Sequence, residues 1–332
     1  MNMPTHQTLI LTRRDVSQVL DIKQSIVSVE KVFKEYALKK AFMPPKVYLR
    51  VDKYHGDFRA MPAFSDGLKA ACVKWVNVHP GNKSIGLPTV MGVIILSDPK
   101  TGFPLCIMDG TYVTSIRTAA AGAVAAKYLA RKDSKIVALV GCGVQAGSQL
   151  LALKEVVKIR EVYVYGPEEK LIKNFIKDVK KFCPCPIFAS KNVESCVKDA
   201  DIIVTTTPSR KPLVYLKWLK KGVHINAIGA DAKGKQELQA DILKKASVVI
   251  DDWAQASHSG EINVPLSRGA ITKKNITATM GEVVCGAKVG RRSLKDITVF
   301  DSTGLAIQDV AVASLVYRAA LKRKKGKWVQ LI

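Results

Sequence analysis

From residue 135 onward, short apolar runs alternate with longer segments whose apolar residues recur every three or four positions. In the segment 168–182, Ile172, Phe175 and Val179 share one face of a helix, and the lysines lie on the other faces. The short runs predict strands over residues 136–140, 162–165, 186–189, 202–205, 223–228, 247–250 and 297–300. Helices are expected between them, most clearly over 146–157 and 168–182. This alternation predicts an α/β fold with a doubly wound parallel sheet.

The first 115 residues show a different pattern, in which an early helix is followed by extended segments separated by turn residues. The helix is predicted over 22–38. Residues 88–96 and 103–108 flank the turn sequence Asp-Pro-Lys-Thr-Gly, which predicts an antiparallel hairpin. We therefore expect an α+β fold for this part of the chain.

Two further helices set the expected domain boundaries. An alanine-rich helix is predicted over 115–129, with Thr114 as its N-cap, and a last helix over 306–321. The last helix follows the final predicted strand and is expected to leave the parallel sheet and rejoin the N-terminal domain. We therefore expect one domain over residues 1–115 and 306–332, and a second over 116–305.

A glycine-rich turn joins the first strand of the second domain to its helix. The pattern is Gly141-x-Gly143-x-x-Ala146, with Val144 and Gln145 inside it. Gly141 permits a tight turn, Gly143 leaves room for a pyrophosphate near the backbone, and Ala146 lets the helix pack closely on the strand. The helix N-terminus offers free N–H groups and a positive dipole end to phosphates. This context indicates a Rossmann-type dinucleotide-binding site, and the alternative is an ordinary glycine-rich turn.

Small and hydroxyl-bearing residues gather where three predicted strands end. The expected cofactor contacts among them are Thr206, Thr207, Pro208, Ile228, Gly229, Ala230 and Ser302. In an open parallel sheet the carboxyl ends of the strands face the ligand, and small residues let a nicotinamide ring approach the backbone. Asp231 places a carboxylate at the mouth of the expected cleft, and helix capping is its alternative role.

Three basic residues occupy positions where solvated cations are not expected. Lys74 lies in the apolar sequence Ala-Cys-Val-Lys-Trp-Val, where burial would lower its pKa toward acid–base duty. The alternative is a packed stem whose head reaches solvent. Arg59 is expected to point inward. Arg117 lies in the first turn of the predicted alanine-rich helix, against the helix dipole, which is unfavourable unless an anion compensates.

The composition narrows the range of partners. A formal net charge of +24 could indicate nucleic-acid binding, but the lysines are spread over polar helix faces, so we expect no specific nucleic-acid partner. Cys183 and Cys185 have no second cysteine pair at zinc-site spacing, so we expect reduced thiols and no metal. No apolar run is long enough to span a bilayer, and residues 1–14 lack a signal-peptide core. We expect a cytoplasmic protein that binds no membrane.

Segments spread in order over nearly the whole chain resemble the ornithine cyclodeaminase/mu-crystallin family. They are MPPKVYL (43–49), RAMPA (59–63), KWVN (74–77), HPGN (79–82), SIRTAA (115–120), GCGVQA (141–146), HINAIGAD (224–231), GEIN (260–263) and FDSTG (300–304). Within the family the archaeal-type alanine dehydrogenase branch is the most similar. The resemblance implies a homodimer that forms through the N-terminal domain, with a shared β-barrel and a Rossmann domain on each side.

The resemblance also implies roles for individual residues. Lys74 matches the catalytic lysine, which is expected to exchange a proton with the reacting carbinolamine or imine. Asp231 matches the aspartate that handles the water or the amine. Arg117 matches an arginine near the substrate carboxylate and the cofactor, and the neighbouring Thr118 is expected to contact the cofactor. Lys46 falls where the family places another carboxylate-binding cation.

Arg59 falls where a cyclodeaminase would have a glutamate that holds the distal amine of ornithine. A buried cation there repels that amine and suits a small substrate that offers only a carboxylate, with Arg50 as a neighbouring alternative for this clamp. We therefore expect reversible oxidative deamination of L-alanine to pyruvate and ammonia. The alternatives are an ornithine cyclodeaminase that makes proline with bound NAD, a ketimine reductase, and a non-catalytic NADP-binding protein of the mu-crystallin kind.

The cofactor is expected to be NAD or NADP. NAD enzymes usually carry an acid at the end of the second strand, but here that strand ends at Gly166 and Glu168 comes slightly late. The missing acid removes a barrier to a 2′-phosphate, although no arginine replaces it and Lys170 is the nearest cation. We therefore expect NADP to be accepted.

Overall fold

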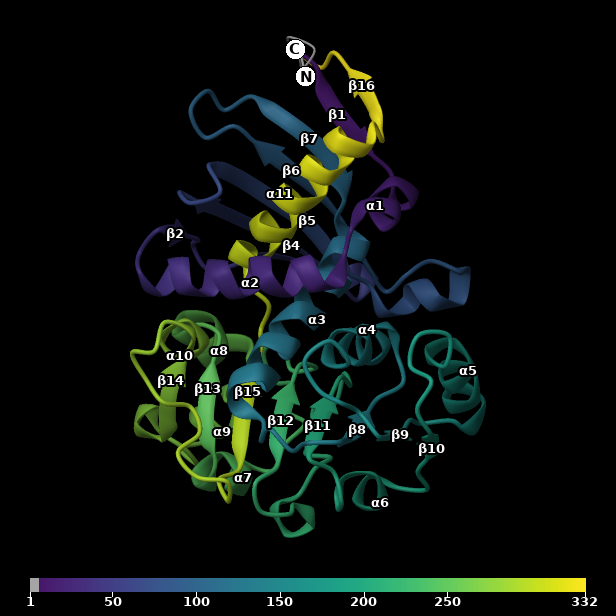
Figure 1. The fold of residues 1–332 in the computed structure, drawn as a ribbon, viewed down its shortest axis with the longest axis vertical. Coiled ribbons are helices and arrows are strands. Elements are labelled where there is room, and N and C mark those ends of the chain that lie inside the picture. The colour runs from purple at the N-terminus through teal and green to yellow at the C-terminus, as the bar shows by residue number, and fades with distance from the viewer. Residues whose placement is uncertain (1–5) are drawn as a thin grey trace. The chain divides into compact units, whose positions relative to one another are not determined.

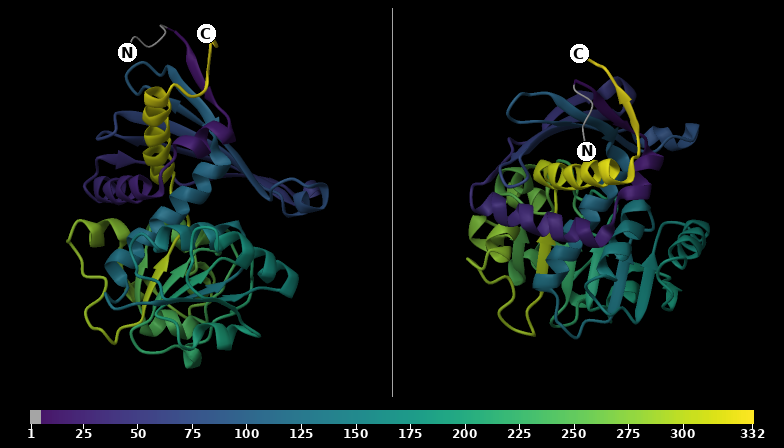
Figure 2. Two further views of the ribbon diagram at one scale, coloured as in Figure 1. Left: turned by 45° about the vertical axis from the view of Figure 1, so that its right-hand side comes forward. Right: turned by 45° about the horizontal axis from the view of Figure 1, so that its top comes forward.

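The computed structural model describes residues 6–332, so the first five residues of the predicted N-terminal domain lie outside the described part. The chain forms two compact units. Unit 1 ends at Arg117 and resumes over Leu305–Ile332, and unit 2 comprises Thr118–Gly304. Each unit contains one sheet with helices packed against it (Figure 1 and Figure 2).

Unit 1 contains a mixed sheet of eight described strands in the order β16-β1-β7-β6-β5-β4-β2, with β3 paired to β4. The strands are β1 (Thr8–Leu11), β2 (Ala41–Phe42), β3 (Val47–Val51), β4 (Gly56–Ser65), β5 (Ala70–Val78), β6 (Val90–Ser97), β7 (Pro104–Asp109) and β16 (Lys327–Val329). Neighbouring strands are antiparallel, except that β1 and β7 are parallel. The antiparallel pairing of β6 with β7, which places Ile94 opposite Met108, confirms the predicted hairpin.

Helices pack against the unit 1 sheet. Helix α2 (Ile22–Ala37) begins where the side chain of Asp21 accepts a hydrogen bond from the amide of Gln24. Helix α11 (Ala306–Arg323) packs against β4, β5, β6 and α2, and α1 (Arg13–Val19) packs against α11 (Figure 2). Most residues of α11 are buried, because apolar side chains occur on all its sides. The last helix, which we expected to rejoin the N-terminal domain, is part of unit 1.

Helix α3 (Gly110–Leu129) begins earlier than predicted. Asp109 caps it, because its carboxylate accepts hydrogen bonds from the amides of Tyr112 at 2.8 Å and Thr111 at 3.3 Å. The prediction of Thr114 as the N-cap is therefore wrong. Arg117 lies two turns inside the helix, so the prediction that it opposes the dipole in the first turn is also wrong.

Unit 2 contains a parallel sheet in the order β10-β9-β8-β11-β12-β15-β13-β14. The strands are β8 (Ile136–Val140), β9 (Glu161–Tyr165), β10 (Ile187–Ala189), β11 (Ile202–Thr205), β12 (His224–Ala227), β13 (Ser247–Ile250), β14 (Ile276–Thr279) and β15 (Thr298–Asp301). The strand order reverses between β8 and β11, and ligands of open α/β sheets bind at such a point. The predicted doubly wound parallel sheet is confirmed, and β14 is a strand that the sequence did not predict.

Helices cover both faces of the unit 2 sheet (Figure 1). They are α4 (Val144–Leu153), α5 (Glu169–Val179), α6 (Val193–Val197), α7 (Ala240–Lys245), α8 (Trp253–Ser259), α9 (Asn263–Ser267) and α10 (Met280–Val284). Val137 and Leu139 of β8 enter the core shared with α4 and α5, whereas Ala138 and Val140 enter the opposite core. Successive residues of a strand point to opposite faces, so a strand buried on both sides is a continuous apolar run.

Short 3₁₀ helices occupy four connections of the described chain, over Asp52–Tyr54, Pro80–Ile85, Leu216–Trp218 and Lys273–Asn275. Within residues 6–332, none of the helices has the length and apolar character that crossing a membrane requires.

Candidate active site

Lys74 lies in the middle of the unit 1 sheet with its side chain completely buried. The residues opposite it, Met61 on β4 and Ile94 on β6, are apolar. Burial is the largest cause that lowers the pKa of Lys74 from 10.5 to about 8, and the neighbouring Arg117 lowers it further. The prediction of a desolvated lysine with a lowered pKa is confirmed, and the alternative of a solvated head is wrong.

The partner of Lys74 is Asp309, which was not predicted as a site residue. The Nζ of Lys74 lies 2.9 Å from Oδ1 and 2.8 Å from Oδ2 of Asp309. The Nε of Arg117 lies 3.2 Å from Oδ1 of the same carboxylate. Nη1 of Arg117 also donates to Oε1 of Gln308 at 2.9 Å. Residues from β5, α3 and α11 therefore meet in one buried polar cluster of unit 1.

Arg59 is buried on β4 and points inward, as predicted. Its Nε donates to Oδ1 of Asp57 at 2.6 Å, and its guanidinium lies 5.2 Å from the ring centroid of Tyr48. These two contacts fix the orientation of the guanidinium. Lys46, immediately before β3, is half-buried, whereas the alternative clamp Arg50 is exposed and pairs with Asp52 at 3.2 Å. The structure therefore favours Arg59 over Arg50 as the inward cation.

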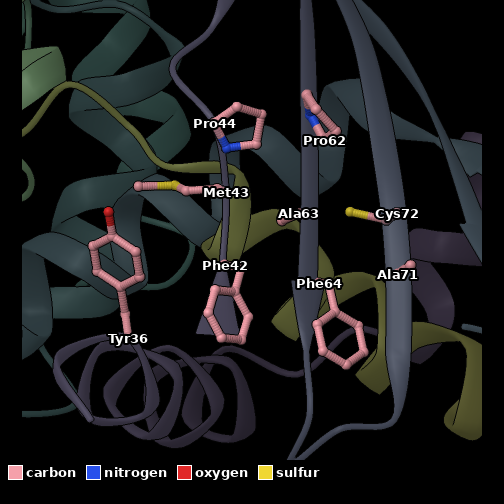
Figure 3. Close-up of a pocket in the computed structure, with 9 residues that line it drawn as sticks. All are labelled: Tyr36, Phe42, Met43, Pro44, Pro62, Ala63, Phe64, Ala71 and Cys72. Atoms are coloured by element: carbon pink, nitrogen blue, oxygen red, sulfur yellow. The ribbon is translucent and has the colours of Figure 1, made fainter. Parts of the chain in front are cut away.

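A hollow of about 680 Å³ lies in unit 1 between α2, the segment around β2, and the strands β4 and β5 (Figure 3). Its lining is mostly apolar and consists of Tyr36, Phe42, Met43, Pro44, Pro62, Ala63, Phe64, Ala71 and Cys72. Cys72 precedes Lys74 by two residues and therefore lies on the same face of β5. The predicted site residues are not among the side chains that line this hollow.

The glycine turn of unit 2 has the geometry that its sequence predicts. Gly141 follows β8 with φ +118°, and a Cβ there would meet the hydroxyl of Thr206. At Gly143 a Cβ would meet no atom within 4 Å, so open space lies against the backbone before α4. Ala146 is completely buried in the core between α4 and the sheet. Val144 is exposed, and the first amides of α4 have no acceptor within the helix, which suits a phosphate.

The strand ends that carry the predicted cofactor residues lie side by side, because β11, β12 and β15 are neighbours in the sheet. Within the described part of the chain, the hydroxyls of Thr206 and Ser302 are buried and have no hydrogen-bond partner. Buried hydroxyls without a partner are costly unless a ligand satisfies them. These atoms and the open space at Gly143 fit a dinucleotide. The start of unit 2, Thr118, accepts a hydrogen bond on its carbonyl from Gln149 at 2.9 Å.

Glu237 connects two of these strand ends and was not predicted as a site residue. Its Oε1 accepts hydrogen bonds from the amide and hydroxyl of Thr207, at 2.6 and 2.7 Å. Its Oε2 accepts from the hydroxyl of Thr205 at 2.7 Å and the amide of Gly229 at 2.9 Å. Burial raises the pKa of Glu237, and these hydrogen bonds oppose the rise. Glu261 in turn accepts from the amide of Glu237 at 2.9 Å.

Asp231 follows β12 and is partly exposed. Its carboxylate pairs with Lys235. The described residues 231–239 that contain and follow it form turns and no helix, so the alternative role of Asp231 as a helix cap is wrong. Gly166, after β9, is buried against Cys142, and a Cβ there would meet the Cys142 sulfur. A side chain at this position would therefore require the neighbouring turn to move.

No disulfide joins the cysteines in the described part of the chain. The sulfur atoms of Cys183 and Cys185 lie 3.3 Å apart, and burial is the main cause that raises the pKa of Cys185 to about 12. Among residues 6–332, no three His, Cys, Asp or Glu side chains are grouped so that they could hold a metal ion.

Comparisons with known proteins cover almost the whole chain. A family model described as "Ornithine cyclodeaminase/mu-crystallin family" matches residues 6–324. An alanine dehydrogenase from Archaeoglobus fulgidus is 53% identical over 325 residues, which are 98% of each chain.

Solved structures show the same similarity. An archaeal alanine dehydrogenase dimer with bound NAD is 51% identical, with a TM-score of 0.94 over 98% of this chain and 100% of that chain. A Delta(1)-pyrroline-2-carboxylate reductase from Thermococcus litoralis, in complex with NADH and L-proline, is 38% identical. Its TM-score is 0.95 over 97% of this chain and 100% of that chain.

Proposed function

The chain belongs to the ornithine cyclodeaminase/mu-crystallin family, as predicted from its sequence, and from this premise we propose that it is an NAD(P)-dependent alanine dehydrogenase. The reaction is the reversible oxidative deamination of L-alanine to pyruvate and ammonia. The observation that most favours L-alanine as the substrate is the buried Arg59, which Asp57 and Tyr48 hold in place. A fixed cation suits the carboxylate of a small substrate and repels a second ammonium group. The similarity to alanine dehydrogenases supports the same choice.

In this proposal the basic residues of unit 1 bind the substrate and move protons. Arg59, Lys46 and Arg117 hold the substrate carboxylate. Lys74 acts as the general base in deamination and as the general acid in amination, because a pKa near 8 permits both states close to neutral pH. Asp231 of unit 2 orients the water or the ammonia.

Unit 2 holds the cofactor, whose nicotinamide exchanges a hydride with the substrate Cα when it is bound. The amides around Gly141, Gly143, Val144, Gln145 and Ala146 bind the pyrophosphate, helped by the positive end of α4. The remaining proposed contacts are Arg117, Thr118, Gly166, Thr206, Thr207, Pro208, Ile228, Gly229, Ala230 and Ser302. We propose that the protein uses NADP as well as NAD.

We also propose that unit 1 is the substrate-binding and dimerisation domain and unit 2 the dinucleotide-binding domain. Trp75 and Val93 are paired across β5 and β6 and are both about half exposed, at 46% and 47%. Ile95 follows on the same face of the sheet and is 37% exposed. An apolar sheet face of this kind suits a second copy of the chain, and the archaeal alanine dehydrogenase of known structure is a dimer. A cytoplasmic location and the lack of a specific nucleic-acid partner remain predictions.

The test is a substrate panel. Purified protein is given L-alanine, L-ornithine, Delta(1)-pyrroline-2-carboxylate, or pyruvate with ammonia, each with the matching form of NAD and NADP. NADH absorbance, pyruvate and proline are followed. We expect NADH and pyruvate from alanine, and NADH consumption with pyruvate plus ammonia. Proline from ornithine without net NADH change would overturn the proposal, and so would turnover of the cyclic imine alone.

A further inference from the structure

Two basic side chains of unit 1 share a single buried carboxylate. Both oxygens of Asp309 lie within 2.9 Å of the Lys74 Nζ, and Arg117 approaches Oδ1 at 3.2 Å. Lys74 and Asp309 are both completely buried. The contact joins β5 to α11 across 235 positions of the chain, so only the packing of the last helix against the sheet brings it about.

We infer that Asp309 is a positioning residue for the reaction: it holds the Lys74 ammonium at one place and sets how readily Lys74 releases its proton, while Arg117 acts in the opposite sense. The inference rests on the proposed function only for what Lys74 does to the substrate. The contact itself is independent of the substrate's identity.

Lysine is a compact charge on a stem with four rotatable bonds, so one fixed position requires a fixed partner. Asp309 supplies that partner with both oxygens, and it is itself fixed on α11, whose neighbouring side chains are buried. Gln308, the preceding residue, holds Arg117 at 2.9 Å and also accepts the amide of Leu305 at 3.2 Å. The start of α11 therefore positions both cations.

The charged and titratable groups that influence Lys74 come from three elements. Burial and Arg117 of α3 lower the pKa of Lys74, whereas Asp309 of α11 raises it. Cys72 of β5 also raises it, although burial raises the thiol's own pKa well above its usual value. Asp309 therefore works against the two largest causes and keeps the pKa of Lys74 near 8 rather than lower.

The effect of Asp309 on the protonation of Lys74 bears on both directions of the proposed reaction. In deamination, an N–H bond forms at the Lys74 Nζ as the substrate's ammonium or the attacking water loses a proton, and in amination the same proton returns. In this scheme Asp309 holds Lys74 by hydrogen bonds and takes no part in the proton exchange itself. Without it, Lys74 is neutral over more of the pH range, which helps its role as a base and impairs its role as an acid.

The direct test is the titration of Lys74 in the absence of substrate. Protein labelled with ¹³C at the lysine Cε is followed by NMR across pH, with the Lys74 signal assigned by its loss in Lys74→Met. We expect Asp309→Asn to lower the pKa of Lys74 by about 1 to 3 units, the usual effect of one close opposite charge. Arg117→Gln is expected to raise it. Glu35→Gln, which neutralises a buried carboxylate of α2 bonded to Ser65, is the control and should leave it unchanged.

The pH dependence of kcat/KM adds the functional readout. In Asp309→Asn, the limb assigned to Lys74 should move to lower pH by the same amount for alanine oxidation and pyruvate amination. If Asp309→Asn does not fold, Asp309→Glu takes its place. In Asp309→Glu we expect a Lys74 pKa near that of the wild type, because the charge is kept. We expect kcat to be lowered more than KM is raised, because the position of the carboxylate changes. An unchanged Lys74 titration in folded Asp309→Asn, or a wild-type kcat in Asp309→Glu, overturns the inference. A wild-type protein that does not oxidise alanine overturns the proposed function instead, because the titration is measured without substrate.

Discussion

The carboxylate of Glu237 accepts a hydrogen bond from the backbone amide of Thr207 at 2.6 Å, which ties a buried loop to the end of strand β11. Its other oxygen accepts from the amide of Gly229 after β12. The two strand ends proposed to hold the nicotinamide are thus fastened by a single side chain. An amide group in place of this carboxylate would point an N–H toward one of the two backbone N–H groups.

Glu237→Gln is therefore expected to destabilise unit 2 and to weaken NADH binding. Loss of a charge-assisted hydrogen bond with a buried donor left unpaired costs about 1.5 to 3 kcal/mol. Urea unfolding and NADH fluorescence titration measure the two effects. Glu169→Gln is the matched control. Glu169 is exposed and pairs with Lys173 across one turn of α5, and an exposed pair of this kind contributes little to the stability of the protein. Equal stability and equal NADH affinity in the two variants would refute this role of Glu237.

Stability should fall in acid because of His224, which is completely buried on β12. Its Nε2 lies 2.9 Å from Oδ1 of Asn226 and its Nδ1 lies 3.0 Å from Oγ1 of Thr298. Burial is the main cause that lowers the pKa of His224 from 6.5 to about 3. Between these values the unfolded chain binds a proton that the folded chain does not, so stability present above pH 6.5 is lost as the pH falls.

The expected slope from this residue is about 1.4 kcal/mol per pH unit below pH 6.5. Urea unfolding at a series of pH values should show a shallower acid slope in His224→Gln than in the wild type. His55→Asn, which removes an exposed histidine, serves as the comparison and should keep the wild-type slope. Parallel slopes for wild type and His224→Gln would show that this histidine is not the acid-sensitive group.

Arg59 should govern the affinity for the substrate carboxylate. Arg59→Ala is expected to raise the KM for pyruvate by roughly 10- to 100-fold, the equivalent of one charge-assisted hydrogen bond, with a smaller effect on kcat. Arg59→Lys keeps the positive charge but loses the planar guanidinium that Asp57 holds. Its KM for pyruvate should therefore lie between those of the wild type and Arg59→Ala. A KM for pyruvate that is unchanged in Arg59→Ala would remove this residue from the proposed clamp.

The cofactor preference should be relaxed, because Gly166 follows β9 where many NAD enzymes carry an acid. We expect kcat/KM values for NAD and NADP that lie within about tenfold of each other. Lys170→Ala should lower kcat/KM for NADP by about two- to fivefold, the usual value of one exposed charge pair, and leave NAD unaffected. Lys177→Ala, farther along α5, is the control. Strict use of NAD by the wild type would contradict the prediction.

The parallel sheet of unit 2 could be predicted because strands buried on both faces are continuous apolar runs. The predicted strands 136–140, 202–205 and 247–250 have the bounds of β8, β11 and β13. Strand β14 was missed because it lies at the edge of the sheet and threonines interrupt its apolar pattern. Sequence periodicity identifies buried strands more readily than edge strands.

The surroundings of the site could be predicted only in part. The burial of Lys74 followed from its apolar neighbours, but its partner lies 235 positions away and depends on the packing of α11. Asp309 did carry a signal of the same kind, since it is the one acidic residue of a helix whose other residues are mostly apolar. The start of α3 was misplaced because Asp109 and Thr114 are both good N-caps, and sequence alone does not show which carboxylate or hydroxyl meets the free amides.

In the proposed reaction, a hydride moves from the Cα of L-alanine to the nicotinamide of the cofactor. The most direct measurement uses L-alanine deuterated at Cα with NAD, followed by mass spectrometry of the NADH and assay of the pyruvate. We expect NADH that carries the deuterium, with pyruvate formed in equal amount. NADH without deuterium, or no NADH from alanine while ornithine is converted to proline, would contradict it.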